Sequence, residues 1–231
     1  MASTIKVDTI TTPDGTGNIS VDRPLSGSGA GLTSLPAANL TGALPAISGA
    51  SLTGMAGGAW NVISSTNITS STASMEFTSG IDATYRTYAL QWEGVTSTSS
   101  IVQGVVTVGD SGGFQQASGY YAVSARYNYT STAGSPQGGD SDVIDLHGSY
   151  YSTSVSGSNQ SGEIIFTRPI DGASFPILRW YVAGFNHSSQ AFNSVGTAIR
   201  KSAITLDRIK WIYSSGNIAT GRFTLYGIAH A

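Results

Sequence analysis

The fold is decided by one stretch near the end of the sequence, which reads Ile204-Thr205-Leu206-Asp207-Arg208-Ile209-Lys210-Trp211-Ile212-Tyr213, then Ser214-Ser215-Gly216-Asn217, and later Gly221-Arg222-Phe223-Thr224-Leu225-Tyr226-Gly227-Ile228. The first and last runs mix apolar, aromatic and β-branched residues with single polar ones, a composition that suits pleated strands. The Ser/Gly/Asn cluster between them is typical of a turn. Two strands joined by a turn are therefore predicted here.

The same pattern extends back to about Ala59. Short apolar or alternating runs are separated by clusters such as Ser111-Gly112-Gly113 and Gly138-Gly139-Asp140, which we interpret as turns. Helical periodicity is hard to find. The predicted strands are Trp60–Ile63, Tyr85–Trp92, Ile101–Val108, Tyr120–Tyr127, Glu163–Phe166, Ile177–Phe185, Ile204–Tyr213 and Gly221–Ile228. Residues 59–231 are therefore expected to form an all-β, jelly-roll-like sandwich, called here the head.

Composition excludes several classes of function. Lys and Arg number 11 and Asp and Glu 13, without a basic run, which argues against binding to nucleic acid. There is no cysteine, so neither disulfides nor thiolate metal sites can form. No apolar run reaches the roughly 20 residues that span a bilayer, and the start of the chain lacks a signal-peptide core. We expect synthesis in a cytoplasm and no membrane insertion.

Residues 1–26 form a first segment with weak alternation. Ile5, Val7 and Ile10 precede a turn signal at Pro13-Asp14-Gly15, which indicates two short strands. A lone hairpin is marginal in water, and open strand edges tend to pair with something. These three apolar residues are therefore predicted to dock onto a partner protein, with a disordered terminus as the alternative.

Residues 27–58 form a second segment that carries a degenerate repeat of leucine with Thr, Gly, Pro and Ala. Its prolines and glycines forbid a continuous helix, yet a flexible linker does not need recurring leucines. Leucines that one chain cannot bury are expected to be buried against copies of the same chain. The sequence thus favours an intertwined trimeric shaft over a linker. The predicted trimer contacts are Leu32, Leu35, Leu40, Leu44 and Leu52.

Two short strings within the head suggest chemistry. Gly109-Asp110-Ser111-Gly112-Gly113 matches the nucleophile region of chymotrypsin-like proteases, but all three histidines lie downstream and a Gly-rich turn explains the string. The region Asp140–His147 could hold a metal ion, although its acids are poorly spaced for one strand face, and a polar loop is favoured. We predict no catalytic, cofactor-binding or metal-binding residues.

Carboxylates and aromatic residues leave two further alternatives open. Glu76, Asp82, Glu93 and Glu163 could supply the acid pair of a polysaccharide-cleaving enzyme, but so small a head offers little room for the groove. In adjacent Tyr-Tyr pairs one ring faces inward and the other outward, so some tyrosines are expected on the surface. The candidates for sugar binding are Tyr120, Tyr121, Tyr150, Tyr151, Trp180 and Trp211, with core packing or a subunit interface favoured for most of them.

Several segments resemble phage structural proteins. The opening Ser3-Thr4-Ile5-Lys6-Val7-Asp8-Thr9-Ile10 and the Leu-Thr-Gly and Leu-Pro-Ala repeats are similar to tail-fibre-like proteins of marine phages and cyanophages. Within the head, Phe77-Thr78-Ser79-Gly80-Ile81-Asp82-Ala83-Thr84-Tyr85 and Ser214–Ile228 resemble phage C-terminal sandwich domains. Between Glu93 and Lys201 the likeness is only one of general texture.

This resemblance implies a non-enzymatic virion appendage. The N-terminus would dock onto a tail, neck or capsid-vertex protein, the shaft would trimerise, and the head would face outward. The expected function is that of a short tail fibre that attaches to the host, with a host surface glycan as a further partner. The alternative is a capsid decoration or head-fibre protein without a receptor role. Sequence alone does not separate the two.

Overall fold

The computed structural model describes residues 59–114, 119–128, 131–147, 159–169, 173–185 and 190–229, with the backbone alone for 131–140. The predicted docking residues Ile5, Val7 and Ile10 and the shaft leucines lie outside these ranges, as do both predicted N-terminal segments, 1–26 and 27–58.

The described residues form strands and contain no helix, so none of them provides an apolar helix long enough to cross a bilayer. The strands are β1 (Trp60–Ile68), β2 (Ser74–Phe77), β3 (Thr87–Ser97), β4 (Gly104–Asp110), β5 (Gly113–Phe114), β6 (Tyr120–Asn128), β7 (Ser131–Ser141), β8 (Ile144–Asp145), β9 (Gln160–Thr167), β10 (Ile177–Phe185), β11 (Ala191–Arg200), β12 (Arg208–Tyr213) and β13 (Ile218–Ile228).

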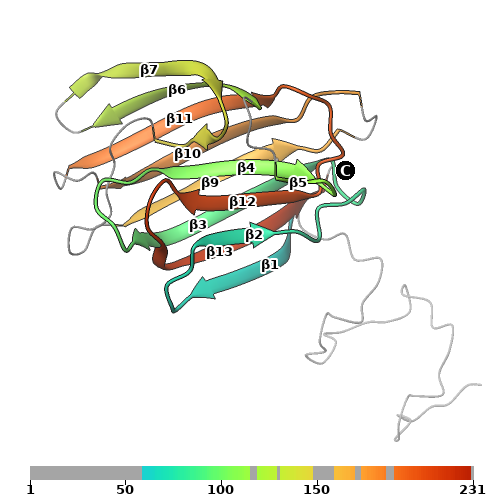
Figure 1. Cartoon of the computed structure of the whole chain (residues 1–231), viewed down its shortest axis with the longest axis horizontal. Helices are drawn as coiled ribbons and strands as arrows, with labels where there is room; N and C mark the ends of the chain where they lie inside the picture. The colour runs from blue at the N-terminus through green and yellow to red at the C-terminus, as the bar shows by residue number, and fades with distance from the viewer. Residues whose placement is uncertain are drawn as a thin grey trace, which may run out of the picture. The chain divides into compact units, whose positions relative to one another are not determined.

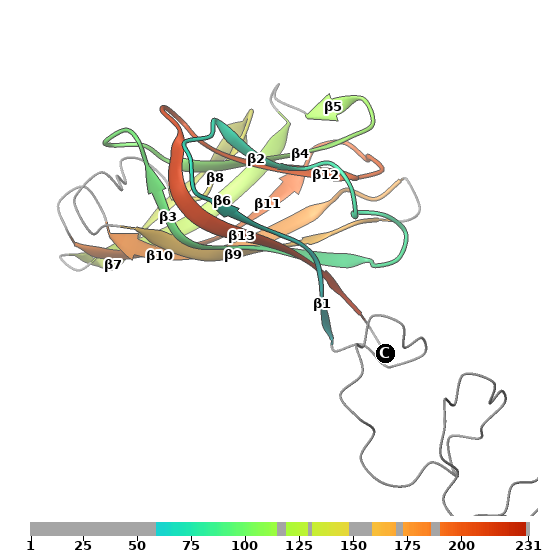
Figure 2. The same cartoon turned by 90° about the horizontal axis from the view of Figure 1, so that it is seen from below.

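The strands build two antiparallel sheets. The larger sheet has the order β1-β13-β3-β9-β10-β11-β6-β7, and the smaller follows the path β2-β12-β4-β5, with β8 also pairing with β4. Figure 1 shows the smaller sheet lying across the larger one, and the turned view in Figure 2 shows the two as separate layers. The prediction of an all-β, sandwich-like head is thereby confirmed.

The core lies between the layers and is rich in aromatic rings. On β12, Ile209, Trp211 and Tyr213 are buried and alternate with partly exposed residues, so one face of the strand turns inward. The Trp211 ring meets Trp92 of the larger sheet at 6.1 Å between centroids and Phe223 at 5.4 Å. Large rings from both sheets therefore interdigitate, which is the packing expected of stacked sheets.

One turn and several strands differ from the sequence-based prediction: β2, β5, β7, β8 and β11 were not predicted, and the predicted strand Ile204–Tyr213 begins only at Arg208. Gly138-Gly139-Asp140 is not a turn, because these residues lie within β7 and pair with β6. The strand β11 was not predicted at all, although it pairs with both β10 and β6. By contrast, the predicted strand Ile177–Phe185 coincides with β10, and the turn at Ser214-Ser215-Gly216-Asn217 is confirmed between β12 and β13.

Candidate functional site

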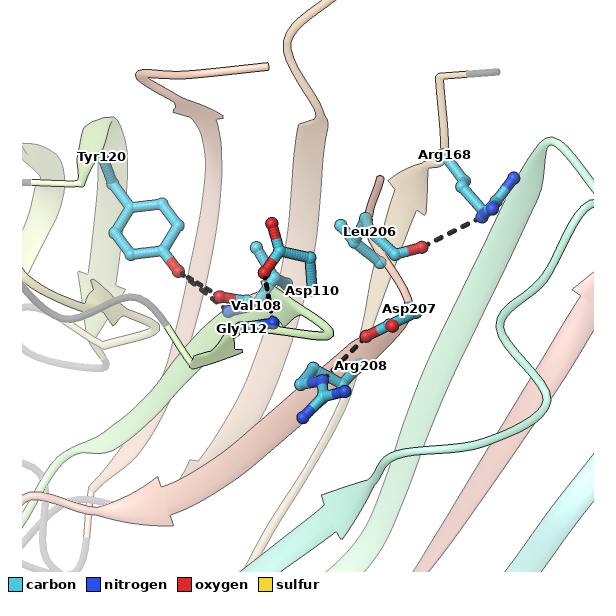
Figure 3. A network of polar contacts seen from close by, with 8 residues as sticks. All are labelled: Val108, Asp110, Gly112, Tyr120, Arg168, Leu206, Asp207 and Arg208. Atoms are coloured by element: carbon cyan, nitrogen blue, oxygen red, sulfur yellow. Dashed lines mark hydrogen bonds and ion pairs between the residues drawn. The ribbon is translucent and has the colours of Figure 1, made fainter. Parts of the chain in front are cut away.

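The Gly-Asp-Ser-Gly-Gly string forms the tight turn that joins β4 to β5. Asp110 Oδ1 accepts a hydrogen bond from the amide of Gly112 at 2.9 Å (Figure 3). A Cβ atom on Gly109 would lie 2.1 Å from the carbonyl oxygen of Gly113, so the first residue of the string has no room for a side chain. Ser111 is exposed at the tip. The requirements of a turn thus explain the residues of the string, as the sequence favoured.

Beside this turn, the Tyr120 side chain ties the two sheets together. Its hydroxyl accepts a hydrogen bond from the amide of Val108 at 2.8 Å and donates to the carbonyl of the same residue at 3.2 Å (Figure 3). On this side of β4, β8 covers one end of the strand and β5 the other, and Val108 lies between the two pairings. Tyr120 thus takes the place of a strand neighbour. Burial raises the pKa of its hydroxyl.

The same region holds two further polar contacts on the loop before β12. Arg168 Nε donates to the carbonyl oxygen of Leu206 at 3.0 Å, and Arg208 Nε lies 2.7 Å from Asp207 Oδ1 (Figure 3). The Arg208–Asp207 pair is partly exposed, where ion pairs contribute little to stability. These contacts fix a loop and do not gather catalytic groups in one place.

His147 lies fully buried between the sheets. The amide of Gly104 donates to its Nδ1 at 2.8 Å, so this nitrogen is the unprotonated one of the neutral ring. Burial lowers the pKa of His147 to about 4, and a hydrogen bond with the Gln160 side chain opposes this fall. Gln160 in turn donates from Nε2 to the Tyr213 hydroxyl at 2.9 Å. His147 is therefore a neutral structural group near neutral pH.

The possible metal site at Asp140–His147 finds no support in the described side chains. Asp145 Oδ1 accepts a hydrogen bond from the amide of His147 at 2.9 Å and so shapes the loop after β8. Among the described residues, no three His, Cys, Asp or Glu side chains gather as metal ligands would.

A second feature is the face of the larger sheet that points away from the smaller one. Along β6, β10 and β11, apolar side chains alternate with buried residues and are exposed on this outer face. We call them the outer apolar patch. Its members are Tyr121, Val123, Tyr127, Ile177, Tyr181, Phe185, Val195 and Ile199. Within the patch, Tyr121 pairs with Ile199 and Tyr181 with Val195 across neighbouring strands. Exposed apolar residues gathered on one face, here with the polar residues Arg179, Asn193 and Thr197 between them, are typical of interaction sites.

The predicted sugar-binding aromatic residues divide between core and surface. Tyr120 is buried while Tyr121 is 60% exposed, which confirms the expected alternation within this Tyr-Tyr pair. Trp180 and Trp211 are buried in the core and cannot meet a ligand. Tyr150 and Tyr151 lie outside the described residues. Tyr127 and Tyr181, which were not singled out in the sequence, join Tyr121 on the outer face.

At the edge of the patch lies a shallow hollow of about 290 Å³ over β3, β9 and β10. It brings together Glu93 and Glu163, two of the four carboxylates considered from the sequence, whereas Glu76 lies on β2 and Asp82 on the loop after it. The hollow is lined by Gln91, Trp92, Glu93, Ser161, Gly162, Glu163, Tyr181 and Ala183. The hollow thus combines the exposed ring of Tyr181 with several polar side chains.

Comparison of the chain with protein-family models and with curated proteins gives no match.

Proposed function

We propose that this chain is a bacteriophage virion protein, a short trimeric tail fibre whose head attaches the particle to its host. In this reading the head is a jelly-roll-like sandwich, residues 27–58 form an intertwined shaft, and residues 1–26 dock onto a tail, neck or capsid-vertex protein. The resemblance of the opening segment and of the repeat to phage fibres supports the assignment of the first two segments.

The observation that carries the proposed role of the head is the outer apolar patch. Three adjacent strands expose aromatic and aliphatic side chains to solvent on a face where polar residues are usual, with Arg179 and Thr197 among them. Tyr residues are favoured at protein and ligand interfaces because one ring offers apolar area and a hydroxyl. A binding face, with no catalytic role, is the use that this surface supports best.

Competition for adsorption tests this function. The purified full chain, added before the phage that carries it, should occupy the receptor and reduce adsorption to host cells. A Val123→Asp variant should compete less, because it places a charge at an exposed position of the patch. Glu76→Gln, on the smaller sheet, is the matched control and should compete as well as the unchanged chain.

Two results would contradict this function. One is an absence of competition by the full chain combined with many antibody-labelled copies over the capsid, which would indicate a decoration protein. The other is competition by Val123→Asp as strong as that of the unchanged chain, which would show that the outer apolar patch does not mediate attachment. A few labelled copies at the tail, together with the loss of competition in the variant, would support it.

A further inference from the structure

We propose that the hollow beside Tyr181 binds a neutral sugar ring of a cell-surface polysaccharide. This inference deepens the proposed attachment function and rests on it for its biological setting. It depends on four features of the hollow: its size, its aromatic wall, its polar groups and the irregular strand that shapes one side.

The hollow arises from small side chains on the outer face. Ser161 and Ala183 are direct cross-strand partners, and neither fills the space between the larger residues around it. Its volume of about 290 Å³ lies near the lower limit of small-molecule sites, which begin at about 300 Å³. It is open to solvent, so a longer chain could extend from the bound ring across the outer face.

Tyr181 supplies an apolar wall. Its side chain is 47% exposed and stands on β10, directly across from Glu163 on one side and from Val195 on the other. A sugar ring has one face of C–H groups and an edge of hydroxyls, so it needs an aromatic surface beside hydrogen-bonding groups. Tyr181 offers the first and its neighbours in the hollow the second.

The polar groups of the hollow are mainly acceptors. Gln91 Nε2 donates to Glu163 Oε2 at 3.3 Å, which holds that carboxylate in one orientation. Glu93 adds a second carboxylate at the rim. Ionised carboxylates only accept hydrogen bonds, so they suit sugar hydroxyls, and they repel acidic sugars. The two carboxylates in the lining therefore favour a neutral saccharide over an acidic one, while Arg222, the cross-strand partner of Glu93 on β13, lies outside the lining.

A β-bulge shapes the side of the hollow formed by β3. The pairing of β3 with β9 shifts between Trp92 and Val95, and Gly94 adopts a positive φ of 59°. The amide of Gly94 donates to Ser161 Oγ at 3.0 Å, so the irregular turn of the strand is held in place. Bulges are common beside binding sites, and here the bulge at Gly94 fixes the end of the hollow next to Glu93 and Ser161.

Two carboxylates around a sugar also raise the possibility of cleavage. A glycosidase needs one carboxyl that stays protonated in apolar surroundings to act as the acid. Glu93 is instead exposed, and Glu163 is hydrogen-bonded by an amide donor. Binding without hydrolysis is the chemistry that these surroundings favour.

The test uses the full chain on a printed array of neutral bacterial oligosaccharides, with uronic-acid-containing ones as acidic counterparts. The unchanged chain should bind neutral members only. Tyr181→Ala should weaken that binding about tenfold, as expected from the loss of one aromatic contact. Phe175→Ala is the matched control, because the Phe175 ring is similarly exposed but lies outside both the hollow and the outer apolar patch. Ala183→Leu, which fills the hollow, should also abolish binding.

Four results would overturn this inference. They are no binding to any neutral member, a preference for acidic members, binding by Tyr181→Ala and Ala183→Leu as strong as that of the unchanged chain, and release of new reducing ends from the oligosaccharides. Its failure is distinct from that of the proposed function. If the full chain blocks adsorption and Tyr181→Ala blocks it equally well, attachment stands and the sugar site falls. If the array shows binding that depends on Tyr181 but the chain does not block adsorption, the site stands without the attachment role.

Discussion

The two faces of the larger sheet are built from the same strands and yet differ in kind. On the inner face, rings such as that of Trp180 are buried. The Trp180 Nε1 donates a hydrogen bond to the carbonyl oxygen of Leu146, which directly follows β8 of the smaller sheet. The outer face exposes Tyr121, Tyr181 and their neighbours. Residues one position apart thus contribute to stability on the inner face and, as we propose, to recognition on the outer face. Substitutions on the inner face should therefore change the free energy of unfolding, and those on the outer face should not.

The largest effect is expected where a ring packs directly against a strand. A Cβ atom on Gly196 would lie 2.2 Å from Trp180 Cζ2. The Trp180 ring is held in place because its Nε1 donates to the carbonyl of Leu146 at 3.1 Å. Gly196→Val should lower the free energy of unfolding by about 3 kcal/mol or more, the upper end for an overfilled core. Urea denaturation monitored by tryptophan fluorescence would measure it.

The adjacent outward residue provides the control for this change. Thr197 is exposed on the same strand, so Thr197→Val should alter stability by no more than about 0.5 kcal/mol. If both substitutions destabilise the head equally, the separation of the two faces does not hold at β11.

The next effect is a dependence of stability on pH that comes from His147. In the folded head the pKa of this imidazole falls to about 4, against 6.5 for an exposed histidine. The unfolded chain therefore binds a proton below pH 6.5 that the folded chain refuses until about pH 4. Stability should be fully present above pH 6.5 and decrease by roughly 3 kcal/mol as the pH falls to 4.

Carboxylates also titrate in the lower part of this range, so the comparison is made with His147→Asn between pH 6.5 and 5. The Asn amide oxygen can still accept the hydrogen bond from Gly104 but takes up no proton. Thermal unfolding in that window should show a smaller slope for the variant. Parallel slopes would mean that His147 is not buried in the neutral form.

The smallest effect on stability is expected from a comparison of two neighbouring tyrosines, one on each face of the sheet. Tyr120→Phe removes the hydroxyl that satisfies both backbone groups of Val108 and should cost about 1–3 kcal/mol, because a buried amide loses its partner. Tyr121→Phe, on the exposed side, should change stability by less than about 0.5 kcal/mol. Equal losses in chemical denaturation would show that the hydroxyl of Tyr120 adds nothing beyond its ring.

The sequence predicted strands well where apolar residues mark the buried side. On β10, Leu178, Trp180 and Val182 are buried in strict alternation, and the predicted limits agree with the structure. The alternation within Tyr120-Tyr121 was predicted for the same reason. Local periodicity is sufficient in such strands because the inward positions are large and apolar.

Strands β11 and β7 escaped prediction for two different reasons. On β11 the inward positions include the small residues Ser194 and Gly196, and the Trp180 ring occupies the space beside Gly196. Val195 and Ile199 point outward. Apolar residues thus lie on both faces of the strand, since Phe192 and Ala198 are buried. The strand β7 joins the sheet through backbone pairing with β6, and its Pro136 is tolerated because no other strand among the described residues pairs with its far side. No local sequence pattern predicts the small inward residues of β11 or the backbone pairing of β7.

The sequence indicated some residues of the hollow but not that they lie together. Glu93 and Glu163 were both considered as carboxylates, but nothing in the sequence shows that the strands holding them are neighbours, because β3 and β9 are separated by five other strands along the chain. One local signal was present: a glycine after Glu93 within an apolar run is typical of a bulge.

The edge pairing of β1 with β13 has a mechanical consequence. The amide of Ala229 donates to the carbonyl of Ala59 at 2.8 Å, so the described chain enters and leaves the head side by side. Ladder hydrogen bonds run across the strands, from Trp60 opposite Ile228 to Ile68 opposite Gly221. A pull along β1 from Ala59, resisted by a ligand held on the outer face, would load these bonds together in shear. A pull that separates Ala59 from Ala229 would instead break them one after another, at much lower force.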